Sequence, residues 1–242
     1  MTNQLAPARP RVVGRRILAG LGIGIGAAVV VGALVWGATA LLNPPTITSD
    51  AFTVGLVALS YASILLGLVI AHGGVKRFLR VAGFTRPTST DVGFALLGWG
   101  SWVVVTGAVY LVWGVATGEA LSPLRDLLQH ASDVARLPTA TPLVLALIAV
   151  RILFLSSALE ESLFRGLLQP WLRQRLPLWA AIAITTVAFA IIHVYPVNYP
   201  AVILFAIIAG LLRARRNSTT TFFMHILTDL SLLVAAILVG LA

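Results

Sequence analysis

The stretch PLVLALIAVRILFLSSALEESLFRGLL at 142–168 is apolar except near its charged residues Arg151, Glu160, Glu161 and Arg165. A run of about 20 predominantly apolar residues is long enough to cross the hydrocarbon core of a bilayer as a helix. A charge near the centre of such a helix costs at least about 2.5–3.5 kcal/mol. The stretch therefore predicts a membrane-spanning helix whose ionised side chains need partners or take part in chemistry.

The composition extends this prediction to the whole chain. Of the 242 residues, 59% are hydrophobic and only 10% are charged, and the mean hydropathy is +0.97. A soluble domain is about half apolar and about a quarter charged. No polar linker divides the chain, so we expect a single integral membrane domain over 1–242. The chain has no Cys, which excludes disulfides, thiolate metal sites and a Cys nucleophile.

Seven apolar segments predict an all-α fold, a polytopic transmembrane helix bundle of about seven spans, with the polar site inside the C-terminal helices. These segments are 17–42, 51–71, 92–117, 142–168, 179–194, 199–212 and 218–241. Apolar residues at helical spacing in the loop 118–141 predict a short amphipathic helix on the membrane surface. In the first span, Gly22 and Gly26 are spaced for close packing against another helix.

The formal charge of +9 comes from short basic clusters between the spans. Lys and Arg concentrate at 1–16, 76–86, 173–175 and 213–216, and the loops between these clusters have no such excess. Cytoplasmic loops are rich in Lys and Arg, so we expect a basic cytoplasmic tail at 1–16 and the C-terminus outside. The pattern indicates the lipid bilayer as a partner and no nucleic acid. An export signal has an apolar region of about 7–15 residues, so we expect the longer first span to be retained.

Acidic and histidine side chains inside the apolar segments form the candidate site. These residues are Glu160, Glu161, His193, His225 and Asp229. Ionisable groups within a membrane usually face the bundle interior or a water-filled cavity, so we expect them to converge. Each one taken singly is better explained as a contact between helices, but the whole set favours a functional site.

Helical spacing assigns partners to the acidic pair. Glu161 and Arg165 are at positions i and i+4, which predicts an internal ion pair. Glu160 is rotated by about 100° from Glu161 and is free to face another helix. Glu160 is therefore the preferred general base.

The same spacing recurs on two later spans. Phe189 and His193 share one face, so an aromatic wall should lie beside the imidazole. His225 and Asp229 repeat the spacing, and we expect Asp229 to hold one ring nitrogen of His225. Two histidines and a carboxylate from three helices could then surround one water.

Three motifs in this order resemble a known family. They are Glu-Glu-Ser-Leu-Phe-Arg at 160–165, Phe-Ala-Ile-Ile-His at 189–193 and His-Ile-Leu-Thr-Asp at 225–229. Together they resemble the motifs of the CAAX prenyl endopeptidase and bacteriocin-processing (CPBP, Abi) family of intramembrane proteases. The resemblance marks 142–242 as a motif-bearing protease core, and the first 140 residues contribute nothing to it.

The resemblance implies hydrolysis of a peptide bond in a peptide or membrane-protein substrate, within or near the membrane. Glu160 would take a proton from the attacking water, and His193 would orient that water. His225, with Asp229 behind it, would stabilise the oxyanion or protonate the leaving amine. Glu160, His193 and His225 would also serve as ligands of one divalent metal such as zinc. The metal-dependent and the glutamate-dependent mechanisms both stay open.

Other classes of protein compete with this hypothesis. The chain has no His-Glu-x-x-His motif and only one intramembrane Asp, and Ser101 lacks the context of a serine protease. A small transporter would show an internal repeat, and the two halves show none. The alternative is a non-catalytic membrane protein for self-immunity or scaffolding.

Overall fold

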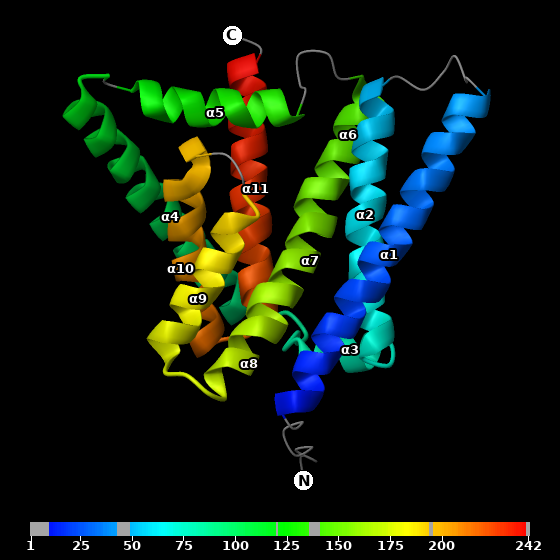
Figure 1. Cartoon of the computed structure of the whole chain (residues 1–242). Helices are drawn as coiled ribbons and strands as arrows, with labels where there is room; N and C mark the ends of the chain where they lie inside the picture. The colour runs from blue at the N-terminus through cyan, green and yellow to red at the C-terminus, as the bar shows by residue number, and fades with distance from the viewer. Residues whose placement is uncertain (1–9, 43–48, 120, 136–140, 194–195, 241–242) are drawn as a thin grey trace.

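The computed structural model describes residues 10–42, 49–119, 121–135, 141–193 and 196–240, and all regular structure within these ranges is helical. The elements are α1 (Pro10–Leu42), α2 (Ser49–Ala71), α3 (Val75–Val81), α4 (Ser89–Thr117), α5 (Ser122–Ala135), α6 (Pro142–Val150), η2 (Arg151–Ser156), α7 (Ser157–Glu160), η3 (Glu161–Leu168), α8 (Gln169–Arg173), α9 (Leu178–Ile191), η4 (Pro196–Asn198), α10 (Tyr199–Arg215) and α11 (Ser218–Gly240). The prediction of an all-α bundle is confirmed (Figure 1).

Each predicted span corresponds to a helix, but the helices differ in length. Among the described residues, five helices are long and apolar enough to cross a membrane: Val13–Gly37, Val54–Ala71, Ser89–Thr117, Pro142–Arg173 and Ser218–Leu238. α9 has 14 residues and α10 has 17. At 1.5 Å per residue they are about 21 and about 26 Å long, shorter than a hydrocarbon core of about 30 Å. These two helices form a short hairpin whose connection, η4, packs against α5.

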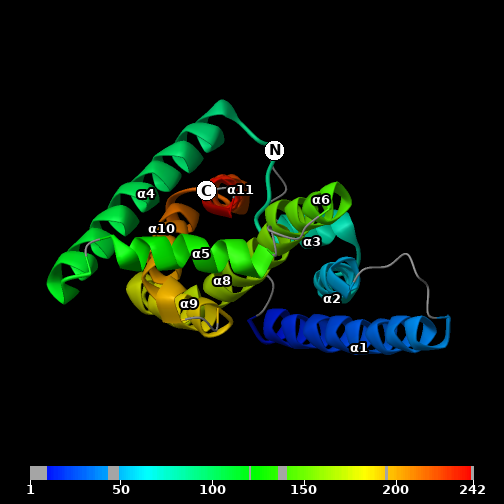
Figure 2. The ribbon, with the colours of Figure 1, turned by 90° about the horizontal axis from the view of Figure 1, so that it is seen from above.

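The amphipathic helix predicted within 118–141 is α5, which runs across one end of the bundle (Figure 2). Leu127 of α5 is buried, and Leu124 packs against the same core. The first turn of α1 and the last turn of α11 lie at opposite ends of the bundle (Figure 1). Parts of the predicted segments lie outside the described residues: 1–9 of the tail, 43–48 and 136–140 of the loops, and 194 and 241 at the ends of spans.

α1 and α2 pack backbone to backbone where glycines meet. A Cβ on Gly24 would overlap the backbone of α2, and a Cβ on Gly67 would overlap the backbone of α1. The prediction that Gly22 and Gly26 make this contact is wrong, because a Cβ on either would have no neighbour within 4 Å. Positions two residues apart in sequence differ by about 200° around a helix. The prediction therefore had the correct four-residue spacing but placed it on the wrong face of α1.

Gly24→Ile is expected to push α1 away from α2 and to destabilise the protein by about 1–3 kcal/mol, the usual effect of overpacking. The measurement is thermal unfolding of the purified protein in detergent. Gly26→Ile is the matched control, because the same side chain then points into open space. Equal melting temperatures for the two variants would show that the α1–α2 contact is not as described.

A buried carboxylate ties α4 to the turn between α10 and α11. Oδ1 of Asp91 accepts hydrogen bonds from Arg216 Nη2 at 2.8 Å, Asn217 Nδ2 at 2.9 Å and Thr220 Oγ1 at 2.8 Å. Its Oδ2 accepts from the backbone and hydroxyl of Thr88, which caps α4. Charge-assisted bonds of this kind are stronger than neutral ones. They fix the base of α11, the helix that carries the third motif.

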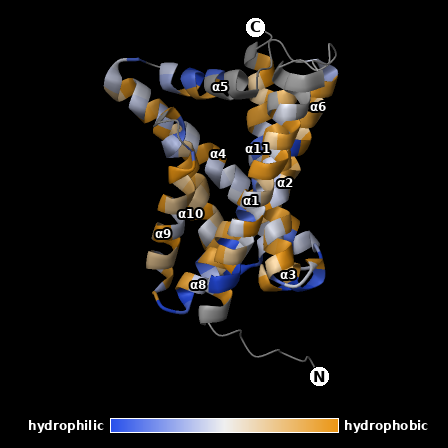
Figure 3. Ribbon diagram, turned by 45° about the vertical axis from the view of Figure 1, so that its right-hand side comes forward, coloured by the Kyte–Doolittle hydropathy of each residue, from blue (hydrophilic) through white to orange (hydrophobic). Residues whose placement is uncertain are grey.

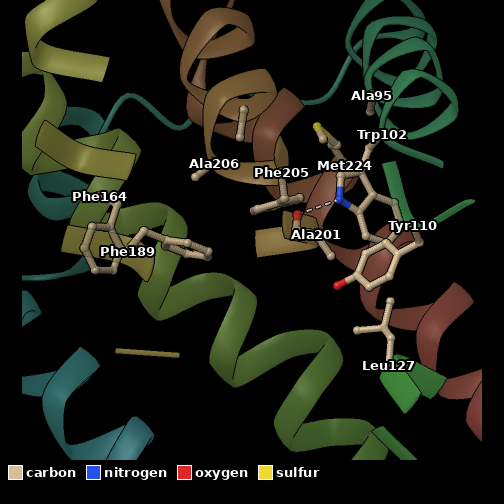
Figure 4. Close-up of a cluster of buried hydrophobic side chains, with 11 residues drawn as sticks. Ala95, Trp102, Tyr110, Leu127, Phe164, Phe189, Ala201, Phe205, Ala206 and Met224 are labelled. Carbon is tan, nitrogen blue, oxygen red and sulfur yellow. Dashed lines mark hydrogen bonds between the residues drawn. The ribbon is translucent and has the colours of Figure 1, made fainter. Parts of the chain in front are cut away.

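The other end of the α9–α10 hairpin is also held by α4. Trp102 donates a hydrogen bond to the carbonyl of Ala201 at 2.9 Å, and Tyr110 donates one to the carbonyl of Val197. Figure 4 shows these rings beside Leu127 of α5, within the main apolar cluster. These bonds therefore position the start of α10 against α4.

Candidate active site

The helix that carries the Glu-Glu motif changes its winding on both sides of Glu160. η2 and η3 are π-helical, and α7 between them is a single α-helical turn that ends at Glu160. The hydroxyl of Ser157 donates to the carbonyl of Ile152, five residues earlier, at 3.2 Å. π-helical turns are rare and are frequently found at functional sites.

Glu161 is the centre of a buried polar cluster. Its Oε1 accepts a hydrogen bond from Arg165 Nη1 at 2.9 Å and lies 2.9 Å from Nδ1 of His225. An ionised carboxylate only accepts, so Nδ1 carries the hydrogen of this bond. The predicted ion pair between Glu161 and Arg165 is confirmed.

The His225 ring meets Asp229, its predicted partner, and a second carboxylate that was not predicted lies closer to the ring. Glu161, on η3, bonds Nδ1, whereas Asp229 Oδ2 lies 3.5 Å from Nε2. The reason is that α11 packs against η3, which brings a carboxylate from a neighbouring helix closer to the ring than one from the same helix. Asp229 therefore shares the Nε2 side of the ring with Glu160.

Nε2 of His225 faces two carboxylates held by adjacent serines. Oε2 of Glu160 lies 3.8 Å from Nε2. The hydroxyl of Ser156 donates to Glu160 Oε1 at 2.7 Å, and that of Ser157 donates to Asp229 Oδ2 at 3.1 Å. Within the described part of the chain, Oε2 of Glu160 is buried and accepts no hydrogen bond. One oxygen of Glu160 is thus anchored, and the other is directed toward the imidazole.

Aromatic rings enclose the cluster. The guanidinium carbon of Arg165 lies 4.3 Å from the ring centroid of Phe189 and 5.1 Å from that of Phe205. The ring of His193 is 4.6 Å from that of Phe189, which confirms the predicted aromatic wall. The ring of Phe205 lies equally close to His225, at 4.6 Å. Cation–π contacts supplement the ion pair in stabilising a buried guanidinium.

His193, His225 and Asp229 line one cavity of about 150 Å³ between α9, α10 and α11. Nδ1 of His193 is 2.8 Å from the carbonyl oxygen of Phe189. A carbonyl only accepts, so Nδ1 carries the hydrogen and Nε2 has the lone pair when the ring is neutral. Phe189 and Phe205 (Figure 4) also line this cavity, so its walls are largely apolar.

The described residues do not fit the zinc site that the sequence allowed. Among them, no group of three or more His, Asp or Glu side chains is placed to hold a metal ion. Of the three expected ligands, the structure brings Glu160 and His225 together, and no ion pair or hydrogen bond between described residues joins His193 to either of them. Zinc ligands should converge at about 2.0–2.2 Å from one point.

Arg151 and Tyr61, which none of the three motifs includes, also lie beside the cluster. Tyr61 of α2 hydrogen bonds with Ser156, and Arg151 interacts electrostatically with Tyr61 and with the carboxylates of Glu160 and Asp229. Arg151 thus supplies a positive charge beside these carboxylates. A Tyr in an apolar span carries no signal of such a role, because Tyr is common near membrane surfaces.

Comparison with known proteins supports the resemblance that the sequence motifs carry. Residues 142–231 match the family model described as type II CAAX prenyl endopeptidase Rce1-like. This segment is similar to the Rce1-like family. The Rce1-like segment contains all three motifs and runs from α6 into α11, so the resemblance read from the sequence is confirmed. No curated protein and no solved structure matches the chain.

Proposed function

We propose that the protein is an intramembrane endopeptidase that hydrolyses a peptide bond in a peptide or membrane-protein substrate. The observation that carries this proposal is the arrangement of Glu160 Oε2 and His225 Nε2, which face each other at 3.8 Å inside the bundle. That separation is too long for a direct hydrogen bond and suits a bridging water. The Rce1-like family, described as prenyl endopeptidases, supports the same class of reaction.

Each group around the bridging water has a role in this mechanism. Glu160 takes a proton from the water as its oxygen attacks the substrate carbonyl carbon. His225 acts as an imidazolium among the carboxylates of Glu160, Glu161 and Asp229, and its Nε2–H donates a hydrogen bond that stabilises the negative charge on the carbonyl oxygen. The proton taken by Glu160 passes to the amine when the C–N bond breaks, which restores the carboxylate.

The remaining groups position these two. Glu161, which is paired with Arg165, accepts a hydrogen bond from Nδ1 of His225, so that Nε2 points toward Glu160. His193 lines the same cavity as His225, and its Nε2 is available to orient the water or the substrate. These are positioning roles except where His193 touches the water directly.

We infer that the start of α1 lies in the cytoplasm and the end of α11 outside. The basic side chains of α3 and α8 and of the end of α10 lie at the end of the bundle where α1 begins, and Figure 3 shows hydrophilic residues at this end. Segments rich in Lys and Arg stay on the cytoplasmic side. Fusion of a reporter to each terminus would test this orientation.

Chelation is expected to leave cleavage unchanged, because the described residues do not form a metal site. The measurement is cleavage after treatment with 1,10-phenanthroline and EDTA, together with elemental analysis of the purified protein. A zinc protease treated in parallel confirms that the chelators act. Loss of cleavage that added zinc restores would contradict the glutamate-dependent mechanism.

The proposed function is tested by cleavage of a quenched peptide library with the purified protein. We expect wild type to cleave and His193→Ala to be slower by about 100-fold, the loss expected when the water or the substrate is misplaced. Glu119→Gln changes an exposed carboxylate and should behave as wild type. A folded wild type as inert as its variants would instead favour the self-immunity or scaffolding alternative.

A further inference from the structure

A cavity much larger than that of the candidate active site lies at the end of the bundle where α1 begins. Its volume is about 970 Å³, and it lies between α1, α3 and the segment from η3 to the residue after α8. The basic residues Lys76, Arg77 and Arg80 of α3 line it, and Val13, Leu167 and Pro170 belong to its apolar wall. The cavity thus combines cationic and apolar surfaces.

Among the described residues, the basic side chains of this cavity have no acidic partner. All three are exposed, and none of the ion pairs between described residues includes them. The sequence has no acidic residue between Asp50 and Asp91, and Asp91 is buried in its own network. Burial lowers the pKa of the His72 imidazole, and the positive charges of Arg16 and Arg77 lower it further. A concave surface with charges of one sign attracts an anion.

A second cavity lies against the opposite face of α3. Its volume is about 490 Å³, and none of its lining residues is charged. Phe78 and Leu79 of α3 line it, whereas Val75 lines both cavities. Ala158 and Ser162, from the helix that carries Glu160, also line it. α3 therefore separates a cationic space from an apolar one, and the two meet at Val75.

We propose that one anionic phospholipid binds across α3, with its phosphate at Lys76, Arg77 and Arg80 and an acyl chain in the apolar cavity. The cationic surface matches the headgroup, and the apolar cavity matches the chain. The site lies at the ends of membrane spans, where anionic headgroups attract clustered Lys and Arg. Trp171 in the wall of the larger cavity is a residue type enriched at membrane interfaces. The bound chain would contact the helix that carries the Glu-Glu motif.

The test is native mass spectrometry of the delipidated full-length protein in neutral detergent, titrated with dioleoylphosphatidylglycerol or dioleoylphosphatidylcholine. We expect saturable binding of one phosphatidylglycerol and much weaker binding of phosphatidylcholine. The triple variant Lys76→Gln, Arg77→Gln, Arg80→Gln should bind phosphatidylglycerol about 100-fold more weakly, at roughly fivefold for each basic residue. Equal affinity for the two lipids would overturn the proposal.

Two further variants separate this site from general electrostatic attraction. The first is a second triple variant, which removes three exposed charges outside the lining of the cavity: Arg86→Gln, Arg173→Gln, Arg215→Gln. It should leave binding unchanged. Val75 is 58% exposed, so Val75→Trp should fold normally while blocking the path between the cavities. Equal losses in the two triple variants would overturn the proposal.

Glycerol 3-phosphate distinguishes a lipid from a free phosphate. We expect it to compete weakly for the wild-type site, and Val75→Trp to weaken the binding of phosphatidylglycerol but not of glycerol 3-phosphate. If glycerol 3-phosphate bound as tightly as the lipid and Val75→Trp changed neither, the site would take a phosphate anion and the lipid proposal would be wrong. None of these measurements depends on peptide cleavage.

Discussion

Glu160→Gln is expected to lower kcat for peptide cleavage by about 10²–10⁴-fold, the usual contribution of a general base. The amide has nearly the same size as the carboxyl group and can still accept the hydrogen bond from Ser156. It cannot take a proton from water at neutral pH. The variant should therefore fold and insert normally, and the loss should fall on kcat and not on KM.

The measurement is the rate of cleavage at saturating peptide, with protein abundance and melting temperature recorded for each variant. Asp126→Asn is a suitable control, because it makes the same chemical change at an exposed carboxylate of α5. Cleavage by Glu160→Gln within a few-fold of wild type would rule out Glu160 as the base. A general loss of folding would appear as a lower melting temperature.

Arg165→Met is expected to destabilise the protein by about 3–5 kcal/mol, because it leaves a buried carboxylate without its cation. Glu161 is fully buried and Arg165 is 2% exposed, so water cannot replace the lost partner. The variant also loses the cation–π contacts with Phe189 and Phe205. Unfolding by SDS in mixed micelles would measure the change in free energy.

The double variant Glu161→Gln, Arg165→Met is the informative control. It removes both charges, and the Gln oxygen can still accept the hydrogen bond from His225 Nδ1. Replacing both members of a buried ion pair by neutral residues is often close to neutral in stability. We therefore expect the double variant to be more stable than Arg165→Met. A single variant as stable as wild type would contradict the description of this pair.

Contacts within one helix were predictable from spacing. Glu161 with Arg165, and Phe189 with His193, lie at i and i+4 and meet as expected. The same rule holds across a change of winding, because the Glu161–Arg165 pair forms within the π-helical η3. The apolar segments likewise predicted the order of the helices.

Contacts between helices were not predictable in the same way. Which ring nitrogen of His225 meets which carboxylate depends on how η3 and α11 are rotated about their axes, and the π-helical turns alter that rotation. The glycine contact shows the same limit, since Gly22 and Gly24 differ only in the face that packing selects. Phe205 lies in the apolar part of α10, where no polar neighbour in the sequence marks it as part of the site.

The central claim is that Glu160 activates a water that cleaves a peptide bond, and isotope labelling tests it most directly. Wild type and Glu160→Gln would be incubated with one cleavable peptide in H₂¹⁸O under single-turnover conditions, and the products analysed by mass spectrometry. The account predicts one ¹⁸O in the new terminal carboxyl group of the wild-type product and almost no product from Glu160→Gln. An unlabelled product, no wild-type product, or a labelled product formed equally fast by Glu160→Gln would contradict it.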